Sequence, residues 1–249
     1  MLNQESIVAT VNNYDIHNFD QVKQYLKYAA LLPDDVANLY TMHCQAISPH
    51  LVTSAARNAG ALFVLCQKHL VLGTTSLFRL YSAQMFRETR AAVEAAGIAH
   101  AIQTDSTAFK VFSEDDGSEA ARRLARKTFA PRSLFPATVP QLALLSDFYD
   151  TASRLSHTSG LTFVRHLIES PTVGQMKFAY QDVQLENMNR DLPQQLFWLC
   201  QAHLGILLAA DVVFKGLHAD LTRFSQERKD VFERLNRFNI SHDNSLGRL

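Results

Sequence analysis

TSLFRLYSAQMFRETRAAVEAAGIAHAIQ, residues 75–103, is the stretch that decides the fold. It begins with a threonine, which can cap a helix, and it contains no proline and a single late glycine. Because proline and glycine are the residues that break helices, their scarcity predicts one uninterrupted helix over the whole stretch. We expect this helix to cross the whole domain.

The composition extends the helical prediction to the rest of the 249-residue chain. Hydrophobic residues make up 47% of the chain and charged residues 19%, whereas only 9 residues are glycine and 7 are proline. A chain of this kind can bury a large core, and it is neither disordered nor rich in β-turns. We therefore expect an all-α protein, an irregular bundle of about seven to nine helices that forms one domain over residues 1–249.

Caps, prolines and apolar residues three or four apart predict the other helices. Their expected ranges are 18–32, 34–42, 49–72, 107–113, 118–129, 138–159, 191–215 and 219–238. The two ends, residues 1–17 and 239–249, are expected to be flexible. Residues 161–181 differ, because Met176, Phe178 and Tyr180 alternate with polar or small residues as in a strand. This alternation predicts a small β-ribbon.

The charge balance disfavours several classes of partner. Basic and acidic residues number 24 each, so no net field attracts nucleic acid or an anionic membrane. Three scattered cysteines, Cys44, Cys66 and Cys200, are typical of reduced thiols. The first residues lack the pattern of a secretory signal, and Asp211 interrupts the apolar stretch 196–214, which favours a buried core helix over a membrane span. We expect a cytoplasmic protein with no membrane partner.

One polar pair stands in a segment that is otherwise rich in small apolar residues. Arg90 and Glu94 lie four residues apart and share a helical face with Gly97, whose missing side chain would let another backbone approach closely. An arginine that precedes a glutamate by four residues is the poorer orientation for simple helix support. The pair therefore indicates interior packing rather than surface decoration.

A second polar group lies on the face of another predicted helix. Tyr149, Ser153 and His157 are spaced four apart and offer a phenol, a hydroxyl and an imidazole. A buried guanidinium or carboxylate needs hydrogen-bond partners, and these three side chains can supply them to Arg90 and Glu94.

Two interpretations of these five residues stay open. In the first, they form a satisfied polar network that fixes the register of two helices. In the second, they form a ligand or catalytic site, in which His157 is the general base, Arg90 binds an anionic group and Glu94 orients one of them. Tyr149 and Ser153 are the further ligand-binding residues of this site. No nucleophile is indicated.

These residues carry a resemblance to a family. RAAVEAAGIAHAI, residues 90–102, resembles the Arg-x3-Glu helix of a family of uncharacterised bacterial helical-bundle proteins, and YDTASRLSHTS, residues 149–159, resembles its Tyr-x2-Leu-Ser-x3-His-x-Ser segment. Ala152 stands where the family has leucine. The likeness spans residues 75–160, and it implies a fold and a site position but no activity. The chain is more distantly similar to nucleotide-binding and ribonuclease helical bundles of prokaryotic defence and toxin systems.

Other motifs are weaker signals. The ribonuclease bundles use an arginine followed by a histidine four to six residues later, and Arg237 with His242 is the pair here that has this spacing. This pair departs from the family pattern in two ways. Phe238 stands where the family has a polar residue, and the pair lies beside a tail that we expect to be mobile instead of inside a helix. The segment 121–132 is basic, but four acidic residues precede it and offset its field, so a solvated helix face is the better interpretation.

Two Cys-x2-His pairs raise the question of a metal site. Cys66 with His69 and Cys200 with His203 lie on apolar predicted helices, and together they have the ligand types of a zinc site. Cysteine is also a common core residue, and no loop ligands support a metal, so core packing is the better account. We expect neither a metal nor another cofactor.

Three functions are compatible with these patterns. The first is a cytoplasmic helical-bundle protein whose polar pocket binds a small or anionic ligand. The second is a metal-independent ribonuclease of a bacterial defence or toxin system, in which a histidine acts as acid or base and an arginine stabilises phosphate charge. The third is a structural protein that acts through contacts with other proteins, including homo-oligomers.

Overall fold

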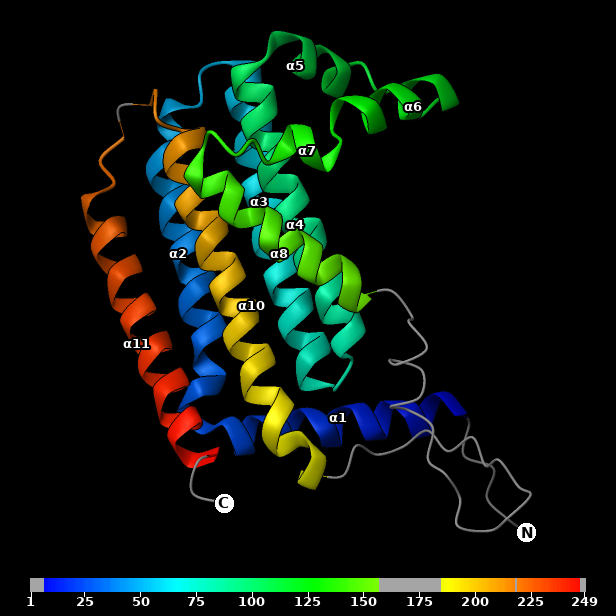
Figure 1. The fold of residues 1–249 in the computed structure, drawn as a ribbon, viewed down its shortest axis with the longest axis vertical. Helices are drawn as coiled ribbons and strands as arrows, with labels where there is room; N and C mark the ends of the chain where they lie inside the picture. The colour runs from blue at the N-terminus through cyan, green and yellow to red at the C-terminus, as the bar shows by residue number, and fades with distance from the viewer. Residues whose placement is uncertain (1–6, 157–184, 218, 247–249) are drawn as a thin grey trace.

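The computed structural model describes residues 7–156, 185–217 and 219–246 (Figure 1). Two 3-10 turns, Lys27–Leu31 and Ser48–His50, join the first helices. The α-helices in chain order are α1 Ile7–Leu26, α2 Leu32–Ile47, α3 Ser54–Phe78, α4 Ser82–Thr104, α5 Ser106–Ser113, α6 Glu119–Thr128, α7 Pro131–Leu134, α8 Pro140–Ser156, α10 Leu185–Val213 and α11 Thr222–Leu246. No strand is found in these residues, which confirms the all-α prediction. The β-ribbon predicted for residues 161–181 lies outside them.

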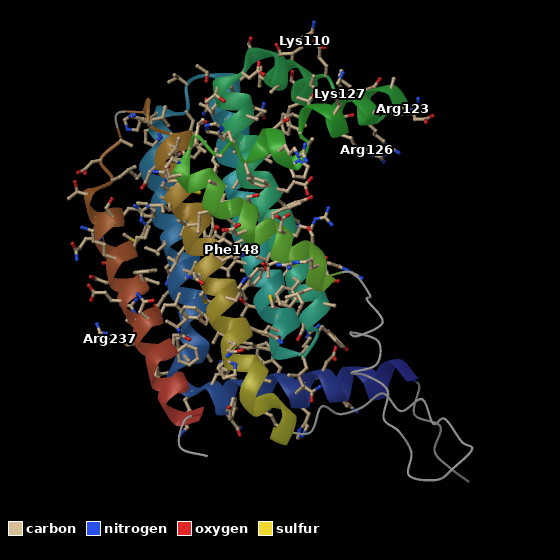
Figure 2. The ribbon with its side chains drawn as sticks, in the orientation of Figure 1. Lys110, Arg123, Arg126, Lys127, Phe148 and Arg237 are labelled. Carbon is tan, nitrogen blue, oxygen red and sulfur yellow. The ribbon has the colours of Figure 1, made fainter. Side chains whose placement is uncertain are left out.

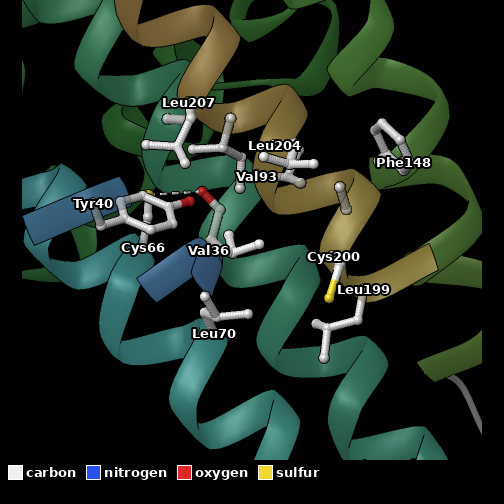
Figure 3. Packing of buried hydrophobic residues seen from close by; sticks show 14 of the residues in the cluster. Val36, Tyr40, Cys66, Leu70, Val93, Phe148, Leu199, Cys200, Leu204 and Leu207 are labelled. Atoms are coloured by element: carbon white, nitrogen blue, oxygen red, sulfur yellow. Dashed lines mark hydrogen bonds between the residues drawn. The ribbon is translucent and has the colours of Figure 1, made fainter. Parts of the chain in front are cut away.

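Helices α4 and α10 form the middle of the bundle. Helix α4 packs against α3, α8 and α10, and α10 also contacts α2, α3, α8 and α11. The side chains of Leu196, Leu199, Ile206 and Leu207 on α10 are fully buried, which confirms the prediction that residues 196–214 include a core helix. Figure 3 shows the core from close by, with side chains from several helices packed against one another.

The helix predicted over residues 75–103 is wrong at its start. Helix α3 continues through Gly73 to Phe78, and a turn over residues 79–81 separates it from α4. Leu80 holds this turn with a φ of 67°, a backbone conformation that leucine rarely adopts. A Cβ atom built on Gly73 would lie 3.4 Å from Leu199 and 3.6 Å from the Cβ of Glu88. Gly73 thus lets two helices pack closely against α3 rather than ending it.

Several other predicted boundaries also differ. Helix α1 begins at Ile7 instead of residue 18, and α11 continues to Leu246, so helix extends into both segments that were expected to be flexible. Pro33 lies in the first turn of α2, where its missing N–H costs nothing. Helix α10 begins at Leu185 and contains Pro193. The predictions for α5, α6 and the start of α8 are confirmed, since the helices begin where their capping residues or proline stand.

Two of the described helices are long and apolar enough to cross a membrane by length and composition. They are α3 and the Leu192–Val213 part of α10. In α10, 67% of the most apolar window is buried inside the protein, as in a core helix. In α3 the buried share is 33%. Helix α3 therefore presents apolar side chains to its surroundings, among them Val64 and Val71, each 53% exposed.

Candidate anion-binding site

Helices α4 and α8 face each other and bring two predicted site residues together. The Nη2 group of Arg90 on α4 donates a hydrogen bond to the hydroxyl of Tyr149 on α8, at 3.1 Å. The guanidinium carbon also lies 5.1 Å from the centre of the Tyr149 ring, within the range of a cation–π interaction. The sequence did not show that these two helices pack together.

Phe135, the residue that directly follows α7, packs against the tyrosine ring. A Cβ atom built on Gly97 would lie 2.9 Å from the Cβ of Leu134 and 3.0 Å from the Phe135 ring. This contact confirms the prediction that another backbone approaches Gly97 closely. The approach places Phe135 against Tyr149, with 5.5 Å between the ring centres. The glycine on α4 therefore helps to fix the position of the tyrosine that contacts Arg90.

Polar atoms in this site have unused hydrogen-bonding capacity. The Nε of Arg90 and the Oγ of Ser153 are both buried and have no hydrogen-bond partner among the residues that the structure describes. No carboxylate pairs with Arg90 among the described residues. Glu94 is half-buried one turn further along α4, and no hydrogen bond or ion pair of its carboxylate is found in the described part of the chain. His157, the predicted base, lies outside the described residues.

The two Cys-x2-His pairs have other partners in the structure. Cys66 is buried and donates to the carbonyl of Ala92 at 3.2 Å, and burial raises the pKa of its thiol. Cys200 is equally buried, and its pKa is raised by the same cause. Within residues 7–156, 185–217 and 219–246, no group of three or more His, Cys, Asp or Glu side chains is arranged to hold a metal ion. The core-packing interpretation of both cysteines is confirmed by their burial.

Two buried histidines form polar features that the sequence did not single out as a group. The hydroxyl of Tyr40 and the Nδ1 of His203 are 2.9 Å apart, and both residues are fully buried. In Figure 3 the ring of Tyr40 lies close to Cys66 in the core. His43, one turn after Tyr40, is also fully buried, and neither of its ring nitrogens has a hydrogen-bond partner within residues 7–156, 185–217 and 219–246.

The rings of three phenylalanines surround His43. The distances from its ring centre to those of Phe63, Phe214 and Phe224 are 5.9, 5.4 and 5.0 Å. Burial lowers the pKa of His43 to about 4 and that of His203 to about 3, because a charged imidazole loses its hydration in the core. Both side chains are therefore neutral at pH 7, and they belong to the packing of the core.

The basic residues of α6 lie apart from this site. Figure 2 shows Arg123, Arg126 and Lys127 on α6 at the outer edge of the molecule, and no residue of this helix is buried. Arg123 pairs with Glu119 within the same helix, at 2.5 Å. The interpretation as a solvated helix face fits this placement.

The ribonuclease-like pair is described only in part. Arg237 is exposed on α11 and lies 3.6 Å from Glu233, whose carboxylate offsets its charge. The side chain of His242 lies outside the described part of the structure. No protein-family model, no curated protein and no solved structure matches this chain. Function is therefore inferred from the geometry of Arg90, Tyr149 and their neighbours.

Proposed function

We propose that this protein is a cytoplasmic helical-bundle protein that binds a small anionic ligand at the Arg90 site. In this proposal Arg90 holds the negatively charged group of the ligand, and the hydroxyls of Tyr149 and Ser153 position it through hydrogen bonds. His157 accepts a proton from the ligand or from water, and Glu94 orients the histidine or the arginine. The proposal requires neither a metal ion nor another cofactor.

The incomplete pairing of Arg90 carries this proposal. A buried polar atom without a partner costs about 1–3 kcal/mol, and the cost is larger for a charged group. A satisfied structural network would give the Nε of Arg90 and the hydroxyl of Ser153 a partner, but neither atom has one in the described part of the chain. The guanidinium is also fixed in direction, because its Nη2 is bonded to a tyrosine that Phe135 holds. An oriented cation with a spare donor suits an anionic group that accepts hydrogen bonds.

Replacing Arg90 tests the proposal. In a thermal-shift screen with phosphate, sulfate, nucleoside monophosphates and short RNAs, an anion that binds the native state should raise the melting temperature of the wild type. Arg90→Gln removes the charge and should weaken binding of that anion by about 10- to 100-fold, the loss expected for a charge-assisted hydrogen bond of roughly 1.5–3 kcal/mol. Tyr149→Phe keeps the ring but removes the hydroxyl, and it should weaken binding less.

Arg237→Gln is the matched control, because Arg237 is exposed on α11 and away from the site (Figure 2). It should bind the anion as tightly as the wild type does. Equal loss in both variants would indicate nonspecific attraction to charge and would contradict the proposal. An RNA that is bound and cleaved, with the cleavage lost in Arg90→Gln, would favour the ribonuclease alternative instead.

The exposed apolar face of α3 favours a second candidate function, association with another copy of this chain. Val64 and Val71 lie seven residues apart on one face of α3, and the nearby Leu65 and Leu72 are 37% and 41% exposed. Apolar side chains that recur every seven residues on an exposed helix are typical of a helix–helix contact between subunits. This candidate gives the protein a structural role and needs no ligand.

Charge on this face should prevent association if the candidate is correct. Sedimentation of the wild type at increasing concentration should show a dimer, and Val64→Asp with Val71→Asp should show a monomer with little loss of stability, because both side chains are already half in water. Leu144→Asp on α8, where the leucine is 42% exposed, is the control and should leave the dimer intact. A monomeric wild type would exclude this candidate.

A further inference from the structure

His69 and Glu88 form a second polar pair, between α3 and α4. The Nδ1 of His69 lies 2.7 Å from the Oε2 of Glu88, and the two side chains are 18% and 15% exposed. Gln84, one turn before Glu88 on α4, donates a hydrogen bond from its side-chain amide to the other carboxylate oxygen, Oε1. The carboxylate is thus held on both sides, by an imidazole and by an amide.

The close packing of α3 and α4 at Gly73 brings His69 and Glu88 together. Gly73 lies one turn after His69 on the same face of α3, and a Cβ atom built on it would be 3.6 Å from the Cβ of Glu88 and 3.7 Å from the carbonyl oxygen of Met85. Since no side chain separates the helices here, α4 lies close enough to α3 for Glu88 to reach the imidazole. Gly73, which was predicted to end a helix, therefore helps to position Glu88 beside His69.

The hydrogen bond decides which ring nitrogen is available for chemistry. An ionised carboxylate can only accept hydrogen bonds, so the Nδ1 of His69 must carry the proton and donate it. In the neutral ring the lone pair then resides on Nε2. This atom has no hydrogen-bond partner among the described residues, and 18% of the His69 side chain is exposed. A histidine oriented by a carboxylate in this way is an activated base or nucleophile.

Two exposed cations neighbour the pair along the chain. Lys68 directly precedes His69 on α3, and Arg87 directly precedes Glu88 on α4 and follows Gln84 by one turn. Their positive charges add to the field around this part of α3 and α4, which favours small anions over neutral compounds. The site shares no residue with the Arg90 site, which uses another face of α4.

We propose that His69 is the nucleophilic imidazole of a second site, which takes small anionic compounds with an activated acyl group. The Nε2 lone pair attacks the acyl carbon and forms a C–N bond, and the bond to the leaving oxygen breaks with its electron pair. Glu88 offsets the positive charge of the acylated ring through the shared Nδ1 proton. Water then adds to the acyl carbon and breaks the C–N bond, which releases a carboxylate and two protons and regenerates the neutral His69.

A chromogenic anionic ester tests this proposal. The full-length protein should release the coloured phenolate from 4-acetoxy-3-nitrobenzoate, and His69→Gln should abolish the release above the buffer rate. Glu88→Gln keeps a hydrogen-bond acceptor but loses the charge, and it should lower the rate by about tenfold or more, in line with the contribution of oriented acid–base groups. His50→Gln is the matched control, because no carboxylate partner of His50 is found in the described residues, and it should react like the wild type.

Two readouts on the wild type do not depend on the folding of a variant. Long-range proton–nitrogen correlation spectra should show His69 with its proton on Nδ1, and mass spectrometry after acid quenching should find the acetyl group on His69 and not on His50. A ring protonated on Nε2, or acetylation spread equally over the surface histidines, would overturn the proposal. So would an unchanged rate in Glu88→Gln. Arg237→Gln, a change on the exposed surface of α11, should leave the ester reaction intact.

Discussion

Lowering the pH from 7 to 4 should remove a large part of the stability of this protein. The pKa of a histidine is near 6.5 in the unfolded chain, and burial lowers it to about 4 in His43 and about 3 in His203. Below pH 6.5 these two histidines therefore bind protons in the unfolded chain but not in the folded protein. The free energy of unfolding consequently falls as the pH falls. The stability from both imidazoles is complete above pH 6.5 and is lost between pH 6.5 and the folded pKa values.

The expected loss is comparable to the whole stability of a domain. One unit of pKa shift corresponds to about 1.4 kcal/mol, so each histidine contributes a loss of about 3 kcal/mol at pH 4. Single domains are stable by about 5–15 kcal/mol, and two such losses bring the protein close to unfolding. Two neighbouring charged residues modify the size of the effect but not its sign: Asp211 raises and Arg228 lowers the pKa of His43, and both weigh less than burial.

Urea unfolding at pH 7, 6, 5 and 4 measures this dependence. His43→Phe fits a cage of phenylalanine rings and removes the titrating group, so it should be at least as stable as the wild type at pH 7. Its stability should also fall by about 3 kcal/mol less between pH 7 and pH 4. His50→Gln, a change outside the core, should follow the wild-type curve. A wild type equally stable at pH 7 and pH 4 would contradict the burial of neutral imidazoles.

Gly97→Val should cause the largest loss among single changes near the Arg90 site. The first added carbon would lie 2.9 Å from the Cβ of Leu134, closer than such atoms come in proteins, and valine adds two more methyl groups. Overpacking of this kind costs typically 1–3 kcal/mol and occasionally more. For a protein of this size the melting temperature should fall by roughly 3–10 °C, since each kcal/mol shifts it by about 2–4 °C.

The same change should weaken anion binding at a distance. Helix α7 must move away from α4, and Phe135 then no longer holds Tyr149 against the guanidinium of Arg90. Thermal unfolding and the anion screen measure the two effects on one sample. Gly216→Val is the control, because a Cβ atom built on Gly216 meets nothing within 4 Å, and it should change neither quantity. A Gly97→Val protein with wild-type stability would mean that α7 does not pack here.

The sequence predicted the helices better than it predicted their ends. Apolar spacing reports a buried stripe, and α5 and α6 begin within one residue of their predicted starts, where the side chains of Asp105 and Ser118 accept hydrogen bonds from the first free N–H groups. The turn at residues 79–81 contains no glycine or proline and was missed. Gly73 was predicted to end a helix, because glycine inside a helix costs about 1 kcal/mol and this cost can be read from the local sequence. The packing against Leu199 and Glu88 outweighs this cost, and it cannot be read from the local sequence.

The site was predicted in part, for a similar reason. Spacing four apart places Arg90 and Glu94 on one face, and Tyr149 and Ser153 on another, whatever lies around them. Which helices face each other depends on the packing of the whole bundle, and that packing joined Arg90 to Tyr149 but left Glu94 without a described partner. His69 and Glu88 lie 19 residues apart in the sequence, and they are in contact only because α3 and α4 pack closely at Gly73.

The sequence by itself determined the all-α class, the buried character of α10 and the faces on which polar residues stand, because each follows from the period of one helix. Only the tertiary structure decided the break between α3 and α4, the Arg90–Tyr149 contact and the His69–Glu88 pair. These features arise from contacts between helices, and their energies come from close packing and from the loss of water around polar groups, neither of which the local sequence specifies.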